Sequence, residues 1–205
     1  MKNRNPAMVF VAAVVCGVLF AGMAAPLPAR SPSPADERIG VPGPIRFGGQ
    51  SFALAWTSHP APDQYKQEYL PAGESVEHYS SMLMIDLTAS AATGKAMARK
   101  MIESLEARKA SDPVVNYQVI TNPANGELIL DFVLSASGAD GKDIIEWNAY
   151  RYSSQGEGVR MVGISRRAYG NQVDPFLRNE LSALRTRDIA ALSALTLPPT
   201  KPRSP

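Results

Sequence analysis

The sequence predicts an α+β fold in which an antiparallel sheet of about six to seven strands packs against two amphipathic helices. Three observations support this: short runs alternate apolar and polar residues, two longer runs have helical periodicity, and the loops between the last strands are too short to cross over a sheet. The predicted order is strands, helix, four strands, helix. At 205 residues, the chain is long enough for one ordinary domain and short for two.

Three strands are predicted before the first helix. Residues 46–56 form an apolar and aromatic run that fits one strand or a strand pair, and residues 65–70 and 81–87 alternate. In the run at 81–87, Met82 and Met84 face one way while Leu83 and Ile85 face the other. Both faces of that strand therefore carry apolar side chains.

A helix is predicted over residues 93–109. Met97, Met101 and Leu105 recur every four residues and form one apolar stripe. Lys109 falls in the last turn, where a cation suits the helix dipole. Asp112-Pro113 then ends the helix, because proline cannot continue it.

Four strands follow as a meander, and a second helix ends the body. The predicted strands are 116–121, 127–135, 144–153 and 159–165, and the turns lie at Asn125-Gly126, Asp140-Gly141 and residues 156–158. Asn-Gly favours a two-residue hairpin because both residues tolerate positive φ. Asp174-Pro175 predicts the helix start, with Asp174 as N-cap and Pro175 at the first helical position.

The N-terminus has the pattern of an export signal. Lys2 and Arg4 precede an uncharged run at 7–25, and small residues near Ala24 favour cleavage there. The same run is long enough for an uncleaved membrane anchor, so both interpretations stay open. The predicted organisation is a signal peptide or anchor at 1–24, a Pro-rich linker at 25–44, a single α+β domain at 45–197 and a disordered Pro-rich tail at 198–205.

Charge and composition exclude several classes of protein. The body at 45–197 has 15 basic and 17 acidic residues, so it lacks the positive field that nucleic-acid binding requires. The one cysteine, Cys16, lies in the N-terminal apolar run, so the body has no disulfide and no thiolate ligand. His59 and His78 are the only histidines, and no HExxH motif occurs. We therefore expect no metal site and no cofactor.

No catalytic motif is recognisable, which favours a protein that is not an enzyme. There is no Gly-x-Ser-x-Gly elbow, and Gly94-Lys95 lacks the glycines of a phosphate-binding loop. A catalytic group can still assemble from distant residues, and only His59 and His78 could serve as its imidazole base. The alternative hypothesis is thus a cell-envelope hydrolase with a dispersed site around His78.

Arginine and tyrosine, which are enriched in binding patches, gather on the last two predicted strands and just after the end of the second. The candidate binding residues are Tyr150, Arg151, Tyr152, Arg160, Arg166, Arg167 and Tyr169. The competing interpretation is a sheet face covered by the C-terminal helix, with the arginines paired to acids. The sequence does not decide between the two.

Three segments carry a resemblance to known proteins. EYLPAGESVEHYSSM at 68–82, EWNAYRY at 146–152 and GISRRAY at 163–169 resemble segments of an uncharacterised family of exported proteins from Gram-negative bacteria. The order of elements also resembles the PsbP-like fold, an α/β/α sandwich. That resemblance implies an accessory or binding module, and it transfers no site residue.

Together these observations predict an exported domain that binds a partner protein in the cell envelope. It would be periplasmic, or anchored in the inner membrane facing the periplasm. A structural envelope protein without a small-molecule site is a further alternative.

Overall fold

The computed structural model describes residues 35–138, 140–156 and 158–203. The predicted export segment at 1–24 and the first half of the predicted linker lie outside the described residues. Within these ranges, no helix combines the length and the hydropathy that a membrane crossing requires.

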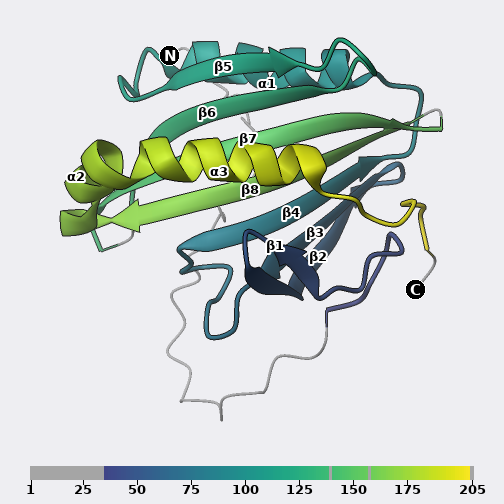
Figure 1. Cartoon of the computed structure of the whole chain (residues 1–205), viewed down its shortest axis with the longest axis horizontal. Coiled ribbons are helices and arrows are strands. Elements are labelled where there is room, and N and C mark those ends of the chain that lie inside the picture. The colour runs from purple at the N-terminus through teal and green to yellow at the C-terminus, as the bar shows by residue number, and fades with distance from the viewer. Residues whose placement is uncertain (1–34, 139, 157, 204–205) are drawn as a thin grey trace, which may run out of the picture. The chain divides into compact units, whose positions relative to one another are not determined.

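Eight strands form one antiparallel sheet, which twists and curls along its width (Figure 1). They are β1 (Ile45–Phe47), β2 (Gln50–Ala61), β3 (Gln64–Leu70), β4 (Ser81–Thr88), β5 (Asn116–Thr121), β6 (Leu128–Ser137), β7 (Asp143–Gln155) and β8 (Gly158–Tyr169). Their order across the sheet is β1-β2-β3-β4-β8-β7-β6-β5. Two four-strand meanders therefore meet where β4 pairs with β8.

The helices lie against one half of the sheet. Helix α1 (Gly94–Arg108) carries the chain from the central strand β4 to the edge strand β5, and its N-cap Thr93 accepts a hydrogen bond from Ala96 N at 3.1 Å. The C-terminal helical segment comprises η1 (Gly170–Gln172), α2 (Val173–Pro175), η2 (Phe176–Glu180) and α3 (Leu181–Ala194). It begins before Asp174, so Asp174 lies in the first turn of α2 and is not the predicted N-cap.

The two main helices contact opposite faces of the sheet. Arg151 Nη1 donates to Leu192 O in α3 at 2.5 Å, whereas a methyl group at Gly94 in α1 would lie 3.0 Å from Tyr152 Cβ. Neighbouring residues of a strand point to opposite faces. Figure 1 accordingly shows α3 in front of β7 and β8 and α1 behind the sheet.

The predicted fold class is wrong. The described chain is mostly strands, eight of them in one curled sheet instead of six to seven. The helices contact mainly the half of the sheet around β6, β7 and β8, and they do not cover both faces throughout as in the PsbP-like sandwich. The extra strand arises because Gly48 and Gly49, with φ of 54° and 84°, turn the run at 46–56 back on itself to make β1 and β2. The core over β3 and β4 is completed by Ile39, Val41, Ile45 and Phe47, from the N-terminal part of the described chain, and not by a helix.

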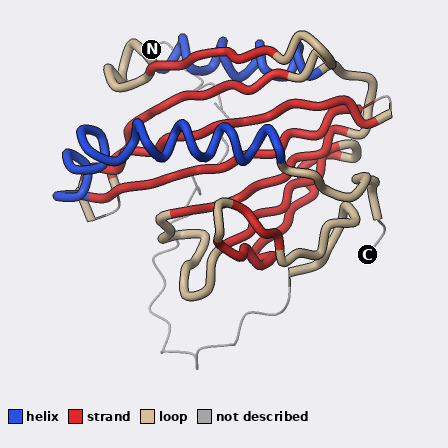
Figure 2. The backbone as a smooth tube through the Cα atoms, in the orientation of Figure 1, coloured by secondary structure: helices blue, strands red, loops and turns tan. Residues whose placement is uncertain are grey.

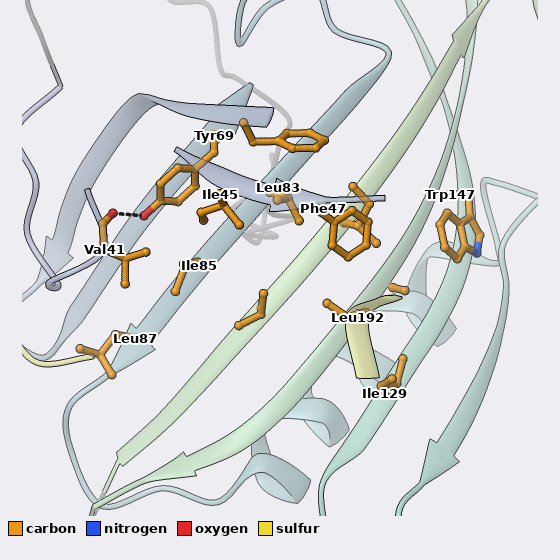
Figure 3. Close-up of a cluster of buried hydrophobic side chains, with 14 of the residues drawn as sticks. Val41, Ile45, Phe47, Tyr69, Leu83, Ile85, Leu87, Ile129, Trp147 and Leu192 are labelled. Carbon is orange, nitrogen blue, oxygen red and sulfur yellow. Dashed lines mark hydrogen bonds between the residues drawn. The ribbon is translucent and has the colours of Figure 1, made fainter. Parts of the chain in front are cut away.

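The main hydrophobic core lies on the α3 side of the sheet (Figure 3). Leu83, Ile85 and Trp147 from the strands meet Leu192 from α3, and all four are 3% exposed or less. Tyr69 OH donates to Val41 O at 2.6 Å, so the loop before β1 is bonded to β3. This core holds the strands of both meanders in one unit.

Two segments outside the predicted 45–197 domain pack onto it. Ile39 and Val41 are 0% and 3% exposed and belong to the core. Lys201 N donates to Ile39 O at 3.1 Å and Arg203 N donates to Arg38 O at 2.8 Å. Residues 195–203, which we call the C-terminal strap, therefore run beside the N-terminal loop (Figure 2). The described domain therefore includes chain on both sides of the predicted bounds.

Candidate functional site

The arginines and tyrosines singled out in the sequence do not share one surface. Arg151, Arg160 and Arg166 lie on the α3 side, because they alternate with residues that face α1. Tyr150, Tyr152 and Arg167 lie on the other face. All of the candidate residues are buried except Arg167 and Tyr169, which are partly exposed.

On the α3 side, the arginines hold the C-terminal segment in place. Arg151 donates to the carbonyl oxygens of Leu192, Ser193 and Leu195 at 2.5, 3.0 and 2.8 Å. Arg160 Nη1 donates to Pro198 O at 3.0 Å. These contacts satisfy carbonyl groups at the end of α3 and in the strap, which gives both arginines a structural role.

Arg166 is part of a buried ion pair with α3. Its Nε donates to Asp188 Oδ2 at 2.7 Å, and its Nη1 donates to Ser81 Oγ at 2.7 Å. Arg187 Nε donates to the other oxygen of Asp188 at 2.9 Å. The Asp188 side chain is fully buried, so the pair joins α3 to the centre of the sheet.

On the α1 side, a second ion pair is enclosed by tyrosines. Arg167 Nε donates to Glu146 Oε2 at 2.7 Å, and Tyr79 OH donates to the same oxygen at 2.9 Å. Arg167 also stacks on the Tyr79 ring, 4.0 Å from its centroid. Burial alone would lower the pKa of Arg167, but the Glu146 charge and the neighbouring tyrosines raise it above its usual value.

Neither His59 nor His78 has contacts typical of a catalytic base. His78 is exposed and stacks on Tyr169 with centroids 4.4 Å apart, and its backbone N–H donates to Ser75 Oγ at 3.2 Å. His59 stacks on Tyr65 at 4.3 Å. Among the residues that the structure describes, no three His, Cys, Asp or Glu side chains are grouped so as to hold a metal ion.

A partly open polar surface lies on the same face as Arg167, over β2, β3 and β4. The register places Trp56 opposite Glu68 and Glu68 opposite Met84, so these side chains share a face. Beside them, Lys66 forms an ion pair with Asp86, with side chains 32% and 26% exposed. We call Trp56, Lys66, Glu68 and Asp86 the Glu68 surface.

Glu68 is the unusual member of this surface. Burial raises the pKa of its carboxyl from 4.5 to about 7, the charge of Asp86 acts in the same direction, and Lys66 and Arg167 oppose them. Trp56 beside it is 40% exposed, which is high for a large hydrophobic side chain. A carboxyl group that titrates near neutral pH beside an exposed indole can donate or accept a hydrogen bond next to an apolar contact.

The Glu68 surface has no signature in the sequence, because its residues come from three strands. The alternation at 65–70 does place Lys66 and Glu68 on one face of a strand. However, the pairing of β2 with β3, including a register shift between Leu54 and Trp56, is what brings Trp56 next to Glu68. No local pattern in the sequence specifies that pairing.

The fold and these sites describe a single α+β domain built mainly on an antiparallel sheet. Residues 39–197 match the model of one uncharacterised protein family, and the chain belongs to that family. The match covers most of the chain, including both ion pairs and the Glu68 surface. No curated protein matches the chain.

Proposed function

We propose that the protein is a binding or accessory domain of the cell envelope that contacts a partner protein through the Glu68 surface. The observation that carries this proposal is the exposed Trp56 beside a carboxyl whose pKa is near 7. Aromatic residues dominate the energetics of protein interfaces, and perturbed carboxyl groups concentrate at functional sites. The buried arginines are engaged within the fold, which favours this surface over the Arg and Tyr group on β7 and β8.

Location in the envelope rests on the N-terminal pattern. A positive start, an uncharged run at 7–25 and small residues near Ala24 support delivery to the periplasm, by cleavage or as an inner-membrane anchor. Alkaline phosphatase fused after residue 44 should be active, because that enzyme folds only after export. Activity no higher than that of a fusion lacking residues 2–24 would contradict export.

Binding is tested by capture from solubilised envelopes with the purified full-length chain as bait. Trp56→Ala should reduce recovery of a specific partner at least tenfold, because loss of an aromatic interface anchor costs about 2 kcal/mol or more. Leu177→Ala, which removes an exposed hydrophobic side chain elsewhere, should recover the partner as the wild type does. Equal recovery with Trp56→Ala, or no specific partner with the wild type, would refute the proposal.

A hydrolase centred on His78 is the alternative that the sequence suggested. Glu146, which binds the Tyr79 hydroxyl, already accepts hydrogen bonds from Tyr79, Asn148 and Arg167, so its oxygens are engaged. The exposed His78 ring lies flat on Tyr169. These contacts favour the binding hypothesis, and a hydrolytic activity lost in His78→Ala but retained in His59→Ala would reverse that preference.

A further inference from the structure

The two edges of the sheet differ in how they are protected against pairing with another strand. At the first edge, β1 covers residues Gln50 to Phe52 of β2. The rest of β2 has register shifts between Leu54 and Trp56 and between Ser58 and Ala61, and it contains Pro60. Bulges and proline are standard means of preventing edge-to-edge pairing.

The opposite edge, β5, has none of these features. It pairs with β6 from Asn116 to Thr121 without a register shift, and its sequence NYQVIT contains no proline, glycine or charge. Within the described residues, β6 is the only strand paired with it. Val119 on this strand is 43% exposed. A regular, uncharged edge strand with an exposed β-branched residue is suited to pairing with another strand.

We propose that β5 is a self-association surface, on which β5 of a second copy of this chain pairs antiparallel to form one continuous sheet. Opposite residues of an antiparallel pair point to the same face. A two-fold axis at Val119 satisfies this rule and places Val119 against its own copy, Gln118 against Ile120 and Tyr117 against Thr121. The axis buries the exposed valine in the middle of the new pair.

A second copy of this chain fits the β5 edge better than another partner does, because β5 is complementary to itself. An uncharged strand meets its copy without like charges in opposition, and its β-branched and aromatic residues form good cross-strand pairs. One short strand gives a small interface, so the dimer is expected to be reversible. The Glu68 surface lies at the other half of the sheet, so this inference is independent of the proposed function.

Sedimentation of the purified full-length chain over a wide concentration range provides the first test. The wild type should shift from monomer to dimer, and Val119→Lys should stay monomeric over the same range. Leu177→Lys, the same type of change at another exposed hydrophobic residue, and Ala55→Lys, at the protected edge, should dimerise as the wild type does. A monomeric wild type, or a dimer lost only in Ala55→Lys, would overturn the proposal.

Disulfide cross-linking tests the register without relying on a disruptive change. In a Cys16→Ser chain, Val119→Cys should form a covalent dimer under mild oxidation, because the two Cβ atoms at the axis lie within about 4.5–5.5 Å. Gln118→Cys is the matched control on the same strand. In this register Gln118 faces Ile120 of the second copy, so the two introduced thiols lie diagonally across the pair, too far apart for a disulfide. Equal cross-linking of both variants, or none with Val119→Cys, would refute this register.

Discussion

Asp188 is the counter-ion of the nearly buried Arg166 on the α3 side of the sheet. It is fully buried and accepts hydrogen bonds from Arg166 and Arg187. Arg166 itself is nearly buried, with Ser81 as its other close acceptor. Removing Asp188 therefore leaves a buried guanidinium without a counter-ion, which costs more than the pair itself contributes.

We expect Asp188→Ala to lower the free energy of unfolding by about 3–5 kcal/mol, measured by urea denaturation. The double variant Arg166→Met with Asp188→Leu should recover most of that loss, because it removes both charges. Asp140→Ala, which breaks an exposed pair with Lys142, should unfold close to the wild type. A small effect of Asp188→Ala would show that water reaches Arg166.

Gly163 is required because the Tyr150 ring occupies the space of a side chain. A Cβ at position 163 would lie 2.8 Å from both Met84 Cγ and Tyr150 Cδ1. The Tyr150 ring is buried and also packs edge-to-face on Phe132, with centroids 5.0 Å apart, so it has little freedom to move.

Gly163→Ala should therefore destabilise the protein by about 1–3 kcal/mol in equilibrium unfolding. In a Tyr150→Leu background, the same substitution should cost clearly less, because the Tyr150 ring is gone and the flexible Met84 side chain can then move aside. If the two changes prove additive, the steric explanation is wrong.

At the scale of elements, the attachment of α3 depends on Arg151. Its guanidinium binds three carbonyl oxygens at the end of the helix, including Leu195 O beyond the last turn. Carbonyl groups at a helix end have no partner within the helix, so a cation there satisfies them and complements the helix dipole.

Arg151→Met should lower stability by about 2–3 kcal/mol and increase hydrogen exchange in the last turn of α3. Amides of β7 away from position 151 should exchange as in the wild type. Arg99→Met, on an exposed position of α1, is the matched control and should leave exchange in α3 unchanged. Unaltered exchange of α3 in Arg151→Met would contradict this role.

The elements themselves were largely predictable. The helix predicted over 93–109 appears as α1, with Thr93 as its N-cap, and the strands at 127–135, 144–153 and 159–165 appear as β6, β7 and β8 with somewhat longer bounds. The loop at Asn125-Gly126 is longer than the predicted two-residue turn, since β5 and β6 close at Thr121 and Leu128. Turn and helix signals act over a few residues, which is why local sequence predicts them.

At the scale of the whole molecule, Glu68 makes stability depend on pH. Its pKa is about 7 in the folded protein and 4.5 as an ordinary carboxyl, so the folded state binds the proton more tightly. The stability that Glu68 contributes by binding this proton is fully present below pH 4.5 and is lost as pH rises through about 7. The shift corresponds to at most about 3 kcal/mol.

Glu68→Gln should therefore unfold with a higher free energy than the wild type at pH 8, and the difference should shrink towards pH 5. Urea denaturation of the variant and the wild type from pH 5 to pH 8 measures the two free energies of unfolding. Glu103→Gln, at an exposed position of α1, should keep the wild-type pH profile. A Glu68→Gln profile parallel to the wild type would show that Glu68 is charged throughout.

The sequence by itself determined α1 and the strands β5 to β8 to within a few residues, because turn chemistry and side-chain periodicity act between near neighbours. It also ruled out a thiol or cysteine-ligated site in the body, since that follows from composition. Only the tertiary structure decided that Arg166 reaches Asp188, that Trp56 lies beside Glu68 and that the sheet has eight strands. Those outcomes depend on pairings such as that of β4 with β8, between segments far apart in the chain, and on which polar groups become buried together.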